Sequence, residues 1–126
     1  MGRIEKLTLY SLVILLLWGN MVSGLGAGLA CPDWPLCFGS FFPEITFPIF
    51  MEHGHRVLGL FVTVFFAFLV KDRLRSYSGA YKLIPILSSI LLAIQIVAGA
   101  LVVVLQLETN ITTFHFGNAI IIFILI

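Results

Sequence analysis

Four long stretches of this chain contain no aspartate, glutamate, lysine or arginine, and they cover residues 7–32, 57–70, 83–107 and 109–126. A helix needs about 20 mainly apolar residues to cross the hydrocarbon core of a bilayer. The first and third stretches reach this length, the second reaches it only if the helix begins near residue 49, and the fourth barely does. The pattern therefore predicts four membrane helices, at about 7–25, 49–70, 83–105 and 111–126.

The composition excludes several classes of protein. Of the 126 residues, 60% are hydrophobic and 10% are charged, whereas a soluble domain is roughly 45–50% apolar and about 25% charged. So few charges exclude a soluble enzyme or a disordered segment, and a net charge of +1 leaves no basic surface for nucleic acid. We expect an all-α integral membrane protein, a four-transmembrane-helix bundle forming a single domain over residues 1–126.

The basic residues predict the orientation of this bundle, because lysine and arginine gather in cytoplasmic segments. Six of the seven basic residues precede the first predicted helix or separate the second from the third: Arg3, Lys6, Lys71, Arg73, Arg75 and Lys82. Both termini are therefore expected in the cytoplasm. The loop 26–48 is expected on the outer face of the cell membrane.

The N-terminal segment also has the basic start and apolar core of a signal peptide. Its apolar run is longer than such a core requires, which favours a retained membrane helix. Gly19 and Ser23, spaced by four residues, suit close helix packing. Gln95 and Gly99 have the same spacing on the third predicted helix, and packing is the expected role there too.

The outer loop contains both cysteines, Cys31 and Cys37, among four of the five prolines. On an oxidising face of the membrane a disulfide between them can persist. A structural staple and a redox-active pair both remain open from the residues alone. A metal site is disfavoured, because two thiolates without a nearby histidine fall short of a closed tetrahedral set.

Titratable residues inside membrane helices are costly and point to function. The second predicted helix carries Glu52, His55 and Arg56 near its outer end, and the fourth carries His115. Both helices run inward from the outer face, so the two histidines lie at depths that differ by roughly one helical turn or less. Two imidazoles meeting across a bundle suit bis-histidine haem ligation, whereas zinc requires further ligands. A hydrogen bond between helices is the alternative role.

Helical phase distinguishes the residues around His55. Glu52 lies three positions before it and shares its face, whereas His53 points about 200° away and is expected to be interfacial without a function. Gly59, one turn further on, leaves room for a flat ligand. Arg56 could pair with Glu52 or contact a haem propionate.

Three elements together resemble the haem A synthase family. They are the segment 24–39 with its Cys31–Pro–Asp–Trp–Pro–Leu–Cys37 core, Glu52–His–Gly–His55–Arg56, and His115 followed by Phe–Gly. The resemblance implies an oxidoreductase that converts haem O to haem A, for terminal oxidases, by oxidising a porphyrin methyl group to a formyl group. It implies axial ligation of haem iron by His55 and His115, an essential acid at Glu52 and an outward cysteine pair. With both axial positions filled, water is the expected source of oxygen.

Typical members of that family are about twice as long and consist of two similar four-helix halves, each with its own histidine pair. This chain corresponds to the half with the cysteines and Glu52, so one bis-histidine haem per protomer is expected. Either protomers associate into a homo-oligomer, which is the expected form, or a second haem is dispensable. Haem O is the expected substrate, with haem B as a further cofactor and the haem O-producing enzyme and an electron acceptor as partners. The alternatives are a b-type cytochrome that only transfers electrons and, less well supported by one cysteine pair, a disulfide-generating enzyme.

Overall fold

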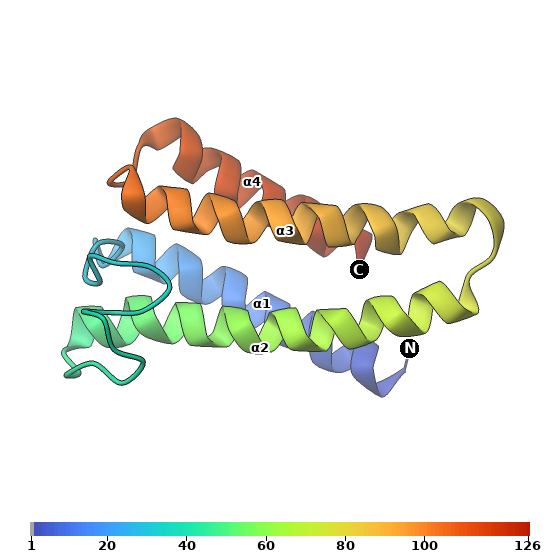
Figure 1. Ribbon diagram of the computed structural model, residues 1–126, viewed down its shortest axis with the longest axis horizontal. Coiled ribbons are helices and arrows are strands. Elements are labelled where there is room, and N and C mark those ends of the chain that lie inside the picture. The colour runs from blue at the N-terminus through green and yellow to red at the C-terminus, as the bar shows by residue number, and fades with distance from the viewer. Residues whose placement is uncertain (1) are drawn as a thin grey trace.

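The structure, a computed structural model, describes residues 2–126, and all its regular elements are helical. They are α1 (Arg3–Gly24), α2 (Phe47–Ser76), the short 3-10 helix η1 (Gly79–Lys82), α3 (Leu83–Val104) and α4 (Thr109–Leu125). Figure 1 shows two antiparallel pairs, α1 with α2 and α3 with α4, stacked into an elongated bundle. The pairs touch through α2 with α3 and through α1 with α4. Helices α2 and α4 therefore lie diagonally across the bundle.

Local sequence explains where the helices begin and end. Pro48 occupies the first turn of α2, where its missing N–H removes no helical hydrogen bond. The Glu108 carboxylate accepts a hydrogen bond of 2.9 Å from the Ile111 N–H and caps the start of α4. Between α3 and α4 the backbone reverses through Gln106 and Leu107, with φ of 53° and 63°.

Helix α2 continues beyond the end of its apolar stretch, where the sequence predicted it to stop at about residue 70. The added turns keep Arg73 inside the bundle, where the guanidinium donates to the Leu125 carbonyl at 3.1 Å and to Glu5 Oε1 at 3.0 Å. Arg73 also donates to the Ile126 carbonyl. One buried arginine therefore links the ends of α1, α2 and α4 at the end of the bundle opposite the cysteine loop (Figure 1).

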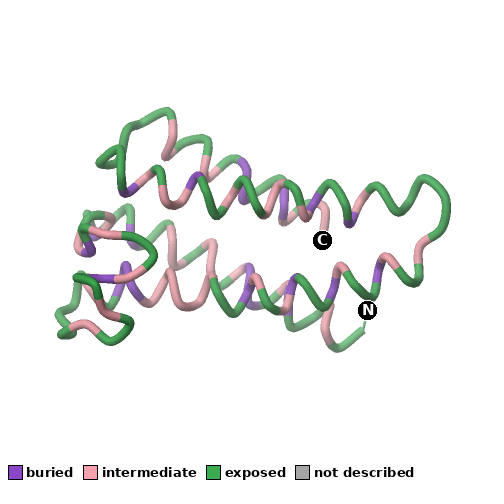
Figure 2. Tube along the Cα trace, in the orientation of Figure 1, coloured by how far each residue is buried: buried purple, intermediate pink, exposed green. Residues whose placement is uncertain are grey.

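Much of each helix is exposed, as the green segments in Figure 2 show, and many of the exposed side chains are large and apolar. One cluster of buried apolar side chains consists of Leu12, Val62, Phe66 and Ile122. Large apolar side chains point outward from every long helix, among them Leu17, Phe68, Ile90 and Ile120. Helices that are apolar on all sides suit a lipid environment rather than water.

Within the described residues, two helical segments are long and apolar enough to cross a membrane: Arg3–Gly24 and Gly79–Val104. Helix α4 is apolar but shorter. These segments fit an all-α membrane protein, as the sequence predicted.

Candidate functional site

The two cysteines form a disulfide that closes a compact loop over one end of the bundle. Cys31 and Cys37 are fully buried, and their Cα atoms are 4.8 Å apart. Asp33 accepts hydrogen bonds from the N–H groups of Phe38 at 2.6 Å and Gly39 at 2.8 Å. These bonds hold Phe38 and Gly39 at φ values of 51° and 69°. They also hold the pKa of the Asp33 carboxyl below its ordinary value, the Gly39 bond contributing most.

Glu52 and Arg56 fasten this loop to α2. Glu52 Oε2 accepts a hydrogen bond of 2.7 Å from the Cys31 N–H, and its other oxygen forms an ion pair with Arg56. Arg56 donates to the carbonyl oxygens of Leu36 at 2.7 Å, Cys31 at 3.3 Å and Asp33. Of the two partners that the sequence allowed for Arg56, the structure shows the ion pair with Glu52.

His55 lies about one turn after Glu52 on α2 and packs against α1. A Cβ atom added to Gly19 would be 2.8 Å from His55 Cε1, so only glycine leaves room for the ring as it lies. The Nδ1 atom of His55 is buried and has no hydrogen-bond partner among the described residues.

His115 has a matching environment in the second helix pair. A Cβ atom on Gly99 of α3 would be 3.2 Å from His115 Cε1. The amide nitrogen of Gln95 lies 3.4 Å from His115 Nε2, and Asn118 donates to Gln95 Oε1 at 2.8 Å. Within residues 2–126, His115 Nδ1 is also buried without a partner. Gln95 and Gly99 therefore position an imidazole. From the sequence, their expected role was helix packing.

The two histidines come from the diagonal helices α2 and α4. Two imidazoles presented from opposite sides of a bundle are able to ligate one metal ion from both sides. A Cβ atom added to Gly59 would not meet the His55 ring. A Cβ there would meet only Leu15 within the described chain, at 4.0 Å, so its expected role in leaving room for a ligand stays a prediction.

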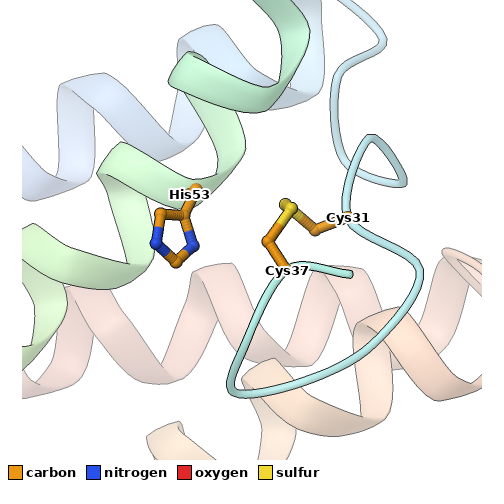
Figure 3. A group of neighbouring side chains, drawn as sticks. All are labelled: Cys31, Cys37 and His53. Carbon is orange, nitrogen blue, oxygen red and sulfur yellow. A yellow bond between two sulfur atoms is a disulfide. The ribbon is translucent and has the colours of Figure 1, made fainter. Parts of the chain in front are cut away.

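His53 is the residue whose place the sequence did not predict. It is only 7% exposed and lies beside the disulfide, as Figure 3 shows. Its Nε2 is 2.9 Å from the Phe41 carbonyl oxygen, and its buried Nδ1 has no partner in the part of the chain that is described. The sequence placed it correctly on a different face from His55. It carried no signal that the loop 31–41 folds back over that face.

Comparison with known proteins identifies relatives along nearly the whole chain. The protein of Bacillus pumilus named "Heme A synthase" is 32% identical over 124 residues, which is 95% of this chain and 40% of the relative. The protein of that name from Bacillus licheniformis is 30% identical over 122 residues, 93% of this chain and 40% of the relative. The one from Geobacillus kaustophilus is 29% identical over 115 residues, 90% and 36% of the two chains.

The chain belongs to the haem A synthase family. This confirms the resemblance seen in the sequence. The chain spans about 40% of the length of the first two of these relatives. No family model matches it, and no solved structure does.

Proposed function

We propose that this chain binds haem between His55 and His115. We propose further that it has the activity for which its relatives are named, that of a haem A synthase. The observation that carries the proposal is the pair of half-buried imidazoles on diagonal helices, each with a buried Nδ1 that has no partner within residues 2–126. A buried polar atom without a partner is costly, so two of them, one on α2 and one on α4, favour a ligand that engages both rings. Arg56 and Gly59 are proposed to border the haem.

The proposed reaction oxidises the methyl group of haem O to the formyl group of haem A, with water as the source of oxygen. Ligation by both histidines would leave no axial position for dioxygen, which is why water is favoured. The electrons and protons removed from the methyl group pass to an acceptor, proposed to be a separate partner.

Glu52 is the proposed catalytic acid of this reaction. It shares a face of α2 with His55, and its carboxylate is held in place by Arg56 and by the Cys31 N–H. A fixed negative charge at this position would stabilise positive charge developing on the methyl carbon, or accept a proton from it.

All four long helices are proposed to span the cell membrane, with the cysteine loop outside and both termini in the cytoplasm. In support, the two described ends of the chain and the α2–α3 connection lie at the same end of the bundle (Figure 1). The six basic residues outside the proposed site fall in the segments nearest that end, as cytoplasmic segments should.

A homo-oligomer is proposed as the working form. One histidine pair per chain provides for one bis-histidine haem, so a second haem, such as haem B, needs a second copy. Closed symmetric assemblies are the usual form of homo-oligomers. The enzyme that supplies haem O is the other proposed partner.

The test is co-expression with a source of haem O, followed by pigment chromatography and an optical spectrum of the purified protein. We expect haem A and a low-spin haem signal, and loss of that signal in His55→Ala and His115→Ala. His53→Gln is the matched control and should keep the signal, because His53 faces the loop. Glu52→Gln should keep haem but stop the formation of haem A; normal haem A output from this variant would refute a catalytic Glu52.

One observation favours a second function, a b-type cytochrome that only transfers electrons. Both oxygens of Glu52 are engaged in fastening the loop, which is a structural role that requires no catalysis. In that case the purified protein would contain haem B alone, even when haem O is supplied.

A further inference from the structure

We propose that reduction of the Cys31–Cys37 disulfide creates a second, separate metal site, in which both cysteine thiolates and His53 bind one thiophilic ion such as Cu(I). The three side chains come together where the cysteine loop covers the outer end of α2, and Figure 3 shows the imidazole facing the two sulfur atoms. Their ligand atoms all lie within 4.8 Å of one another, and all three residues are buried.

The hydrogen bonding of His53 leaves the correct nitrogen available. A backbone carbonyl only accepts hydrogen bonds, so Nε2 carries the proton that it donates to the Phe41 oxygen at 2.9 Å. Nδ1 then presents a lone pair, and in residues 2–126 nothing donates to it. Metal-binding histidines commonly donate their second N–H to a backbone carbonyl, which fixes the tautomer and the orientation of the ring. His53 has this arrangement already.

The loop is anchored independently of the disulfide. The Cys31 backbone is bonded on both sides, its N–H to Glu52 and its carbonyl oxygen to Arg56, and Arg56 also holds the Leu36 carbonyl. When the S–S bond breaks, both ends of the cysteine segment therefore stay next to His53.

The chemistry balances with a dithiol as reductant. The dithiol is oxidised to its own disulfide while the S–S bond takes up two electrons and two protons to give two thiols. Binding of the metal ion then releases both thiol protons to solvent. Two thiolates and one imidazole form a soft set of three ligands, which suits Cu(I), whereas Zn²⁺ would need a fourth ligand such as water.

The test uses the full chain in detergent, reduced with dithiothreitol, desalted without oxygen and titrated with Cu(I) against a chromophoric chelator. We expect one additional tightly bound Cu(I) in the reduced protein compared with the disulfide form. His55 and His115 are present in both forms, so this difference subtracts any metal that they bind. X-ray absorption should show sulfur and nitrogen ligands on the additional ion.

His53→Gln is the decisive variant, since glutamine can still donate to the Phe41 carbonyl but provides no imidazole. We expect it to weaken Cu(I) binding at least by the loss that is typical of removing an outer-shell partner of a ligand, which is on the order of 10–100-fold. Two titratable thiols and the low-spin haem spectrum should show that the fold is intact. Unchanged affinity in this variant would overturn the three-ligand site. So would reduced protein that binds no more Cu(I) than the disulfide form.

Discussion

The His55 ring occupies the space beside Gly19 that any larger residue would fill, with Cε1 only 2.8 Å from where a Cβ would be. His115 has the same relationship to Gly99, at 3.2 Å. In each case the glycine belongs to the other helix of the same antiparallel pair. The two halves of the bundle therefore present a histidine in the same way, each ring supported by the glycine of its neighbouring helix.

Replacing Gly19 with alanine should push the His55 ring out of its present position. The imidazole is rigid, so it cannot bend around the added methyl group as a flexible side chain would. Overpacking of this kind costs roughly 1–3 kcal/mol, and we expect haem affinity and the low-spin signal to fall together. Gly99→Ala should have a smaller effect because its contact is longer. An optical haem titration of each variant measures both.

Gly117→Ala is the matched control for these two variants. Gly117 lies on α4 close to His115, but a Cβ there meets no atom of the described residues within 4 Å. Alanine favours the helix over glycine by roughly 0.5–1 kcal/mol, so this variant should bind haem normally and be slightly more stable. If it lost haem as Gly19→Ala does, the loss could not be assigned to a clash with the ring.

The sequence predicted the helices and the residues of the proposed haem site through signals that are local. Runs without charge marked the helices, and Glu52, His55 and Arg56 stood out because titratable groups are costly inside a membrane helix. The supporting contacts were not predictable in this way. That Gly19 faces His55, or that Gln95 contacts His115, depends on how separate helices rotate against each other, which a single sequence does not specify.

The position of His53 under the cysteine loop shows the same limit. Its phase on the helix correctly separated it from His55. The sequence disfavoured a metal site at the cysteines, however, on the ground that no histidine was near them. The loop brings the disulfide to His53 through hydrogen bonds of Cys31 with Glu52 and Arg56. Such side-chain to backbone contacts leave no periodic pattern in a sequence.

Arg56→Gln should detach the cysteine loop from α2. Arg56 and Glu52 have side chains that are 10% and 5% exposed, and removing one partner of a buried ion pair typically costs about 3–5 kcal/mol. We expect faster reduction of the disulfide by a dithiol and new proteolytic cleavage within 31–40. The exposed Arg75 provides the control. An equal acceleration in Arg75→Gln would mean that charge alone, rather than the contacts of Arg56, is responsible.

Arg73→Gln should loosen the opposite end of the bundle, since glutamine cannot reach Glu5 and the carbonyl oxygens at the end of α4 together. Hydrogen exchange should increase in the last turns of α4 and the first turn of α1, while exchange in the cysteine loop stays unchanged. Arg73→Lys keeps the charge but loses the planar fork and should have an intermediate effect. Full protection in the lysine variant would show that charge, rather than the forked geometry, holds these ends.

The closure of the cysteine loop should depend on the ionisation of Asp33. Bonds from the Gly39 and Phe38 N–H groups hold the pKa of Asp33 below its ordinary value of 3.8, so the carboxylate stabilises the closed loop. This contribution is complete above the ordinary value and is lost as the pH falls through the lowered one. The rate at which a phosphine reduces the disulfide should therefore rise only below pH 3.8.

Glu52 also holds the loop, so two variants are needed to show which carboxyl causes the faster reduction in acid. Asp33→Asn removes the charged acceptor, so its disulfide should be reduced faster at neutral pH and should show little further increase in acid. Glu44→Gln changes an exposed carboxyl elsewhere in the loop and should leave the profile of the original protein unchanged. An acid transition that persists in full in Asp33→Asn would assign it to Glu52 instead, and Asp33 would then have no part in the pH dependence of the loop.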